Sequence, residues 1–179
     1  MDLPPNNISP HGLAKLTVEA FARDRVIIRP PAEPRGVLAN RAGVFVTVRS
    51  FGGQLRGCIG TIDPSCNTVA EEVIQNAISA ATRDPRFQPV SFRELSGLQY
   101  GVDVLSRPEP VRGPEDLDPG VFGVIVETFD GLHRGLLLPR IVGIESVEEQ
   151  WLAVHSKAGI RLGASVRVER FTVTRFGKD

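Results

Sequence analysis

The 179-residue sequence has two cysteines, three histidines, one tryptophan and no excess charge of either sign. Two cysteines are too few for a disulfide framework, and no group of cysteines and histidines has the spacing of a zinc ribbon. The 21 basic residues balance the 21 acidic residues, so no general attraction to a phosphate backbone or an anionic membrane is expected. We therefore expect neither nucleic acid nor a membrane as a partner.

Long apolar runs and a targeting segment are missing as well. No stretch approaches the roughly 18 to 20 apolar residues of a membrane helix, and residues 1–7 lack the basic and apolar regions of a secretory signal. Together with the low cysteine content, this predicts a cytoplasmic protein. The sequence has no phosphate-binding loop, dinucleotide fingerprint, zinc-protease motif or serine-hydrolase elbow, and we expect no cofactor and no metal.

What remains is the composition of an ordinary globular protein. Hydrophobic residues make up 41% of the chain and charged residues 23%, and the length is that of one domain. Residues 1–10 are rich in proline and asparagine and are predicted to form a loose N-terminal arm. Residues 11–179 are predicted to form a single domain.

Turn and cap signals divide this domain into helices and strands. The glycine pair at 52–53 and the Asp130-Gly131 pair predict two hairpins. Two capping boxes, Thr68 with Glu71 and Ser146 with Glu149, predict helix starts. The predicted helices cover residues 11–26, 68–83 and 146–159, and the predicted strands cover 43–51, 54–62, 98–105, 122–128, 132–138 and 164–176. The order of these elements favours an α+β fold with a mostly antiparallel sheet flanked by helices, and the last strand is expected to hold a bulge near Glu169-Arg170.

The most unusual segment is LRGCIG at residues 55–60, where Cys58 lies between glycines. Glycine inside a strand indicates a bulge or the close approach of another group. Arg56 shares the strand parity of Cys58, and a nearby cation favours the thiolate. One interpretation is a nucleophilic or ligand-binding thiol in a pocket lined by glycine. The other is a buried cysteine that behaves as a small hydrophobic side chain beside glycines needed for packing.

A second candidate segment, DPRF at residues 84–87, follows the end of the predicted helix 68–83. Arg86 has the fork geometry that binds an anion through two hydrogen bonds. Alternatively, Asp84 and Arg86 hold the loop together while Phe87 fills the core. Asn76 lies in the middle of the helix, where its amide faces either a polar site or water, and the sequence does not decide between them.

These motifs converge on a known family. The segments GVFVTVRSFGGQLRGCIG, AISAATRDPRFQPVS, VDVLSRPEP, GLLLPR and KAGI resemble the AMMECR-type domain family, whose prokaryotic members are also called AmmeMemoRadiSam system protein A, over residues 11–176. The resemblance implies a compact α+β fold with a smaller second lobe and a cleft near residues 55–60. It also implies association with a Memo-like protein and a radical SAM protein, but it brings no established reaction.

Two functions follow as hypotheses. The first is a binding module or accessory component that works with Memo-like and radical SAM proteins through a cleft at LRGCIG. The alternative is an enzyme in which Cys58 is the nucleophile or holds the substrate, while Arg56 and Arg86 bind an anionic group. The residues predicted to bind a substrate or partner are Arg56, Gly57, Gly60, Asn76, Asp84 and Arg86. Nucleic-acid binding through an arginine patch is the weakest hypothesis, because the net charge is zero and no aromatic residues are interleaved with basic ones.

Overall fold

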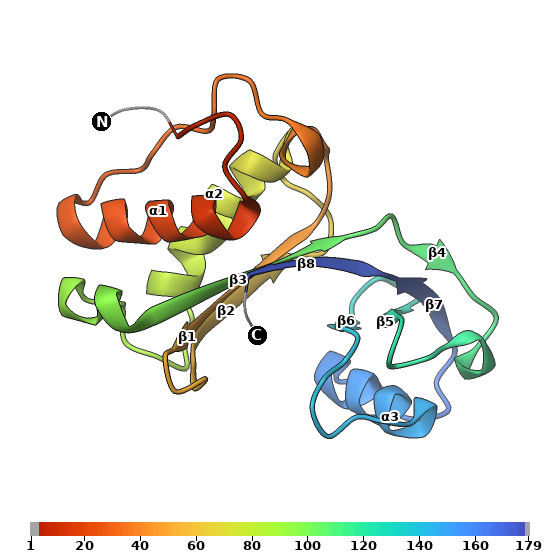
Figure 1. Cartoon of the computed structure of the whole chain (residues 1–179). Coiled ribbons are helices and arrows are strands. Elements are labelled where there is room, and N and C mark those ends of the chain that lie inside the picture. Colours follow the sequence, from red (N-terminus) through yellow and green to blue (C-terminus); the bar gives the residue numbers. More distant parts are fainter. Residues whose placement is uncertain (1–3, 178–179) are drawn as a thin grey trace. The chain divides into compact units, whose positions relative to one another are not determined.

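The computed structural model describes residues 4–177 and divides into two compact units. The first unit comprises residues up to Val104 together with those from Thr174 onward, and the smaller second unit comprises Leu105–Val173. Each unit contains helices and a four-stranded sheet (Figure 1). The predicted α+β class with mostly antiparallel pairing is confirmed, although the strands form two sheets rather than one.

The boundaries of the elements follow the turn and cap signals closely. The helices are α1 (Pro10–Asp24), α2 (Val69–Thr82) and α3 (Val147–Ala158), and short 3-10 turns are η1 (Gly36–Ala39), η2 (Phe92–Gly97) and η3 (Pro114–Asp116). The strands are β1 (Val44–Ser50), β2 (Leu55–Thr61), β3 (Leu98–Leu105), β4 (Glu109–Pro110), β5 (Gly123–Thr128), β6 (Arg134–Leu137), β7 (Val166–Phe171) and β8 (Val173–Gly177). Among the described residues, no helix has both the length and the apolar character that crossing a bilayer requires.

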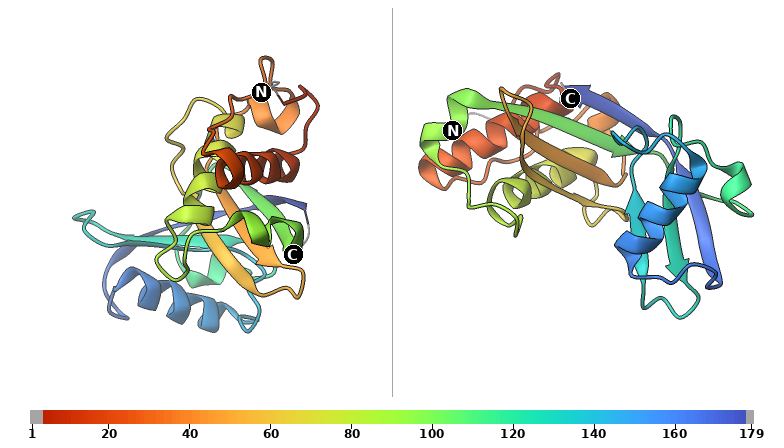
Figure 2. Two further views of the ribbon diagram at one scale, coloured as in Figure 1. Left: turned by 90° about the vertical axis from the view of Figure 1, so that its left-hand side faces the viewer. Right: turned by 90° about the horizontal axis from the view of Figure 1, so that it is seen from below.

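In the first unit the sheet has the order β2-β1-β3-β8, so β2 lies at an edge. Helices α1 and α2 pack on one face of this sheet, above the strands in Figure 1, and the view from below in Figure 2 looks toward the other face. The side chains of Val44, Val46 and Val48 on β1 are completely buried beneath the helices. Because side chains alternate along a strand, the residues between these valines face the other way.

The start of α2 is the predicted capping box. The Thr68 hydroxyl accepts a hydrogen bond from the amide of Glu71, and the Glu71 carboxylate accepts one from the amide of Thr68. These two bonds satisfy amides that the helix leaves without partners at its first turn. The helix ends just before Pro85, whose ring excludes a helical conformation at the preceding residue.

The N-terminal segment runs directly into α1. Residues 1–3 of the predicted arm lie outside the described residues. In the described part, Ile8 packs against the core of the first unit, and the Ser9 hydroxyl accepts a hydrogen bond from the Gly12 amide to cap α1. Pro10 occupies the first position of the helix, where its missing N–H costs nothing.

The second unit has its own sheet and its own core. The strand order is β4-β7-β5-β6, and α3 packs against β5 and β6. Val124 and Val126 of β5 and Val154 of α3 are fully buried in the core of this unit. Gly135 on β6 lies where a Cβ atom would collide with Ala158 of α3, so the strand and the helix approach each other at a glycine.

The C-terminal strand prediction needs a correction. Residues 164–176 do not form one strand with a bulge at Glu169-Arg170, because β7 pairs with β5 without any register shift at these two residues. The break lies at Thr172, between β7 in one sheet and β8 in the other. Thr172 and Ser106 exchange hydrogen bonds of 2.9 Å at this point. The change in the hydrophobic pattern therefore marks the passage of the chain from one sheet to the next.

Candidate functional site

The sheet of the first unit carries the motif cysteine on the face opposite α1 and α2. We call this surface the Cys58 face and define it by Phe45, Thr47, Cys58, Gly60 and Gly101. Thr47 lies directly opposite Cys58 on β2 and Gly101 on β3, and Phe45 lies opposite Gly60. All five residues are half-buried. Cys58, Thr47 and Gly101 thus form a row of small residues across three neighbouring strands. This row lies on the face that the two helices of this unit leave uncovered.

Cys58 is a free thiol in polar surroundings. Its sulfur lies 3.4 Å from the Thr47 hydroxyl, and within residues 4–177 this is the hydrogen-bond partner found for the thiol. A nucleophilic cysteine normally has a histidine or another base within hydrogen-bond distance. The described residues place no such base against Cys58.

The Cys58 backbone is tied to the loop that follows α2. Its amide donates a 2.9 Å hydrogen bond to Oδ2 of Asp84, whose side chain is almost completely buried. Asp84 also accepts hydrogen bonds from the backbone amide of Arg86 and from Nε and Nη2 of its guanidinium, at 2.7 to 3.1 Å. These bonds from Arg86, followed by the one from Cys58, lower the pKa of Asp84 well below its usual range despite burial. The DPRF segment therefore clamps its own loop onto the edge strand.

Arg86 remains partly available to solvent. The carboxylate of Asp84 raises the pKa of Arg86, so the side chain keeps its positive charge. Nη2 is also 3.5 Å from the carbonyl oxygen of Cys58, and 55% of the side chain is exposed. Arg86 thus combines the loop-holding role with an exposed cationic edge beside Cys58.

Arg56 is fully engaged by its own chain. Its Nε donates to Oε1 of Glu94 at 2.7 Å and its Nη2 donates to Oε2 at 3.2 Å. The guanidinium also donates to the carbonyl oxygens of Gln88 and Pro89. The bonds from Arg56, followed by those from Ser91, lower the pKa of Glu94 to about 2 in spite of partial burial. The structure gives Arg56 the geometry of a tether between β2 and the segment that leads to η2.

The motif glycines make room for neighbouring groups of the same unit. A Cβ atom at Gly57 would collide with the backbone carbonyl of Ala80 in α2. A Cβ atom at Gly60 would collide with the ring of Phe45 on the adjacent strand. Both contacts belong to the packing of β2, so the glycines need no bound ligand to account for them.

Asn76 and Glu72 form a buried polar layer between α2 and the sheet. The Asn76 amide donates to the carbonyl oxygen of Val44 at 3.0 Å and to the hydroxyl of Thr61 at 3.1 Å. Glu72 has no exposed surface and accepts hydrogen bonds from Thr61, Ser65 and the amide of Cys66. Burial by itself raises the pKa of Glu72, but these bonds outweigh it and lower the pKa. Asn76 therefore faces neither water nor an open polar site.

Sequence reasoning missed Glu72 because an acidic residue in the first turn of a helix is ordinarily an exposed partner of the helix dipole. The available signal was the spacing of four between Glu72 and Asn76, which puts two polar side chains on one face of α2. Val69 and Val73 are buried on the same helix. A polar pair beside buried valines indicates an internal hydrogen-bond network.

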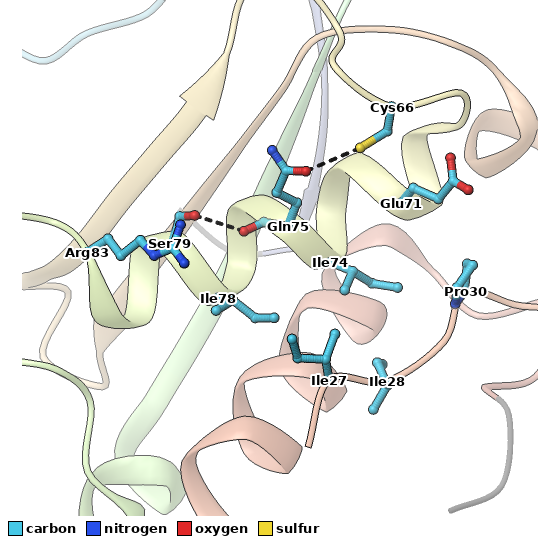
Figure 3. A pocket seen from close by; sticks show the side chains of 10 residues that line it. All are labelled: Ile27, Ile28, Pro30, Cys66, Glu71, Ile74, Gln75, Ile78, Ser79 and Arg83. Carbon is cyan, nitrogen blue, oxygen red and sulfur yellow. Dashed lines mark hydrogen bonds between the residues drawn. The ribbon is translucent and has the colours of Figure 1, made fainter. Parts of the chain in front are cut away.

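Sequence reasoning also missed a pocket on α2 that the Cys58 motif does not touch. It has a volume of about 450 Å³, and the segment after α1 forms its second wall (Figure 3). Ile27, Ile74 and Arg83 are among its lining residues. Within residues 4–177, no group of three or more histidine, cysteine, aspartate or glutamate side chains is placed to hold a metal ion.

Comparisons with known proteins agree with the fold described above. The family model described as AMMECR1 matches residues 11–177. A protein of Thermotoga maritima is 47% identical over 161 residues, which make up 89% of this chain and 91% of that protein. A protein of Clostridium acetobutylicum is 47% identical over 135 residues, which cover 75% of this chain but 28% of that longer protein. The crystal structure of an uncharacterized protein from Pyrococcus horikoshii is similar with a TM-score of 0.85 and 33% identity, covering 95% of this chain and 90% of that one.

Proposed function

Since the chain belongs to the AMMECR1 family, we propose that it is a binding module that works with a Memo-like protein and a radical SAM protein through the Cys58 face. In this proposal the module recognises a partner and does not itself break or form covalent bonds. Cys58, Thr47 and the exposed edge of Arg86 contact the partner. Gly60 belongs to the same face, while Asn76 and Gly57 support it from the side of α2 and Asp84 supports it from the edge of β2.

The observation that carries this proposal is the state of the groups that catalysis would need. Arg56 is held by Glu94, and Arg86 is held by Asp84, so neither guanidinium has its full set of donors free for an anionic substrate. Within the described residues the Cys58 thiol contacts a threonine hydroxyl rather than a base. A surface whose charges are already paired is better suited to recognition than to nucleophilic chemistry.

Two further features support a partner on this face. The row of Cys58, Thr47 and Gly101 offers little side-chain bulk, so that another protein surface can approach the sheet closely. The edge of β2 is occupied by Asp84 and by the loop it anchors, so addition of a partner strand at this edge is disfavoured. The Clostridium relative extends well beyond the matched region, which supports a domain that operates together with other domains.

The proposal is tested by co-purification of this chain with the Memo-like protein and the radical SAM protein. Thr47→Arg places a long side chain on the Cys58 face, and we expect it to reduce retention of a partner at least tenfold. Arg49, two residues along the same strand, shows that an arginine is compatible with this side of β1. Ser96→Arg adds the same side chain at an exposed position in η2 and is expected to leave retention unchanged.

Cys58→Ser separates recognition from catalysis. Serine keeps the size and the hydrogen bond to Thr47 but is a far weaker nucleophile. We therefore expect unchanged retention of the partner proteins and an unchanged rate of the reaction that the assembled proteins carry out. Loss of the assembly's chemistry with unchanged retention would overturn the proposal in favour of a nucleophilic Cys58. Equal retention of wild type and Thr47→Arg would show that partners do not bind at this face.

A further inference from the structure

The pocket on α2 has a two-sided lining that points to a definite class of ligand. Ile74 and Ile78 are four residues apart, and so lie on one face of the helix and form an apolar floor. Ile27 and Ile28, from the extended segment after α1, face this floor across the pocket (Figure 3). Ile27 is 63% exposed, which leaves an apolar surface in contact with water at the rim.

A row of polar residues borders the isoleucines along the same helix. Glu71, Gln75, Ser79 and Arg83 follow each other at spacings of four and therefore form one continuous polar stripe. Figure 3 shows Gln75 and Ser79 on the side of α2 away from Ile74 and Ile78. The pocket thus has one apolar side and one hydrogen-bonding side.

Most of these polar groups already have partners within the chain. The Glu71 carboxylate accepts from the amides of residues 67 and 68, and the Ser79 hydroxyl donates to the Gln75 carbonyl oxygen. The Cys66 thiol lies 3.4 Å from Oε1 of Gln75, and burial raises the pKa of this thiol, which keeps it neutral. Arg83 differs, because the described residues supply no hydrogen bond or ion pair to its guanidinium. The lining of the pocket therefore includes a cation that is available to a ligand.

We propose that this pocket binds an elongated apolar molecule with a single carboxylate, its chain lying along Ile74 and Ile78 and its carboxylate against Arg83. The volume of about 450 Å³ falls within the range of small-molecule sites. The rise along α2 from Ile74 to Arg83 is about 14 Å at 1.5 Å per residue, which suits a medium-length acyl chain. This site is separate from the Cys58 face and does not depend on the function proposed for it.

Calorimetric titration with decanoate tests the proposal, with decanol and decyltrimethylammonium as probes of the same chain length, all below their micelle concentrations. We expect one decanoate to bind per chain and both other probes to bind more weakly. Arg83→Gln is expected to lower decanoate affinity about fivefold and to leave decanol affinity unchanged, since an exposed ion pair contributes at most about that factor. Arg93→Gln removes an exposed arginine outside the pocket and serves as the matched control.

Ile27→Ser tests the apolar side without endangering the fold, because Ile27 is largely exposed. We expect about a tenfold loss of affinity for decanoate and for decanol. Leu132→Ser, at an exposed leucine of the second unit, is the matched control and should have no effect. Thr47→Arg should also bind decanoate normally, which distinguishes this site from the Cys58 face.

Three results would overturn the proposal. A titration with decanoate that gives no saturable heat would remove the ligand class altogether. Equal affinities for decanoate and decanol, together with an unaffected Arg83→Gln, would remove the carboxylate from Arg83. Saturable binding that Ile27→Ser does not weaken would place the ligand outside this pocket.

Discussion

Asp84 shows how a single side chain can serve a loop and a strand at once. One oxygen of its carboxylate accepts from the Cys58 amide at the sheet edge, and both oxygens accept from Arg86 in the same loop. An amide of an edge strand would otherwise face water or a foreign strand. The charge of Asp84 is therefore part of the structure that holds the Cys58 motif in place.

Replacement of this carboxylate by an amide should destabilise the protein. We expect Asp84→Asn to lower the free energy of unfolding by about 1.5 to 3 kcal/mol at pH 7, the usual contribution of hydrogen bonds to a charged group. Urea unfolding monitored by circular dichroism measures this difference. Glu33→Gln, which removes an exposed ion pair with Arg35, is the control and should change stability by less than about 0.5 kcal/mol.

The stabilities of wild type and Asp84→Asn should respond differently to acid. The pKa of Asp84 is lowered in the folded state, so its stabilisation is fully present above the ordinary value of 3.8 and is lost as the pH falls below it. The stability difference between wild type and Asp84→Asn should therefore shrink when unfolding is repeated between pH 5 and about pH 2.5. A difference that stays constant across this range would contradict the proposed role of the charge.

Cys66 offers a residue-scale test of the pocket lining. Burial raises the pKa of its thiol, and a thiol reacts with iodoacetamide only as the thiolate. In a Cys58→Ser background, we expect the labelling rate of Cys66 to reach its midpoint at a higher pH than in the urea-unfolded chain. Mass spectrometry of quenched samples measures both midpoints. A lower midpoint in the folded protein would contradict the raised pKa of the Cys66 thiol.

At the scale of elements, the contact between β2 and α2 depends on Gly57. The carbonyl of Ala80 occupies the space that a side chain at position 57 would need. A backbone carbonyl inside a helix cannot move aside as the end of a flexible side chain can. The strand with the Cys58 motif and the helix that lines the pocket are therefore fitted to each other at this glycine.

A substitution at this contact should be costly for its size. We expect Gly57→Ala to lower the free energy of unfolding by about 1 to 3 kcal/mol, because the added methyl group overpacks the interface. Gly97→Ala is the matched control, since nothing lies within 4 Å of its added Cβ atom. Thermal unfolding of the two variants side by side measures the difference, and equal melting temperatures would show that β2 and α2 can separate at no cost.

At the scale of the whole molecule, each unit encloses its own cluster of buried residues. The core of the first unit is built around residues such as Leu13 and Val73, and that of the second around Val124 and Val154. Both cores are formed by a sheet face and the helices packed on it, which is the usual two-layer arrangement of an α+β protein. A cavity made in one core therefore acts first on its own unit.

Hydrogen exchange can detect this local effect. Val154→Ala removes two methyl groups from the second core, and we expect faster amide exchange mainly in α3, β5 and β6. Leu13→Ala should accelerate exchange mainly in α1, α2 and the β1–β3 strands. Equal acceleration across both units in either variant would show that they open as one cooperative body.

The sequence by itself determined the local structure and the family. Capping boxes at Thr68 and Ser146 and the turn at Asp130-Gly131 all appear where their side-chain and backbone chemistry predicts them. These signals act within a few residues along the chain, so sequence is enough to read them. The LRGCIG and DPRF motifs likewise identified the family over nearly the whole chain.

Only the tertiary structure decided what the motif residues touch. Arg56 meets Glu94, 38 positions away, and Cys58 meets Asp84, 26 positions away, and no spacing rule links such distant partners. Contacts between distant segments also divide residues 166–177 between two sheets and form the pocket on α2. Each depends on which surfaces are brought together when distant segments pack, and packing is a property of the folded chain rather than of any local stretch.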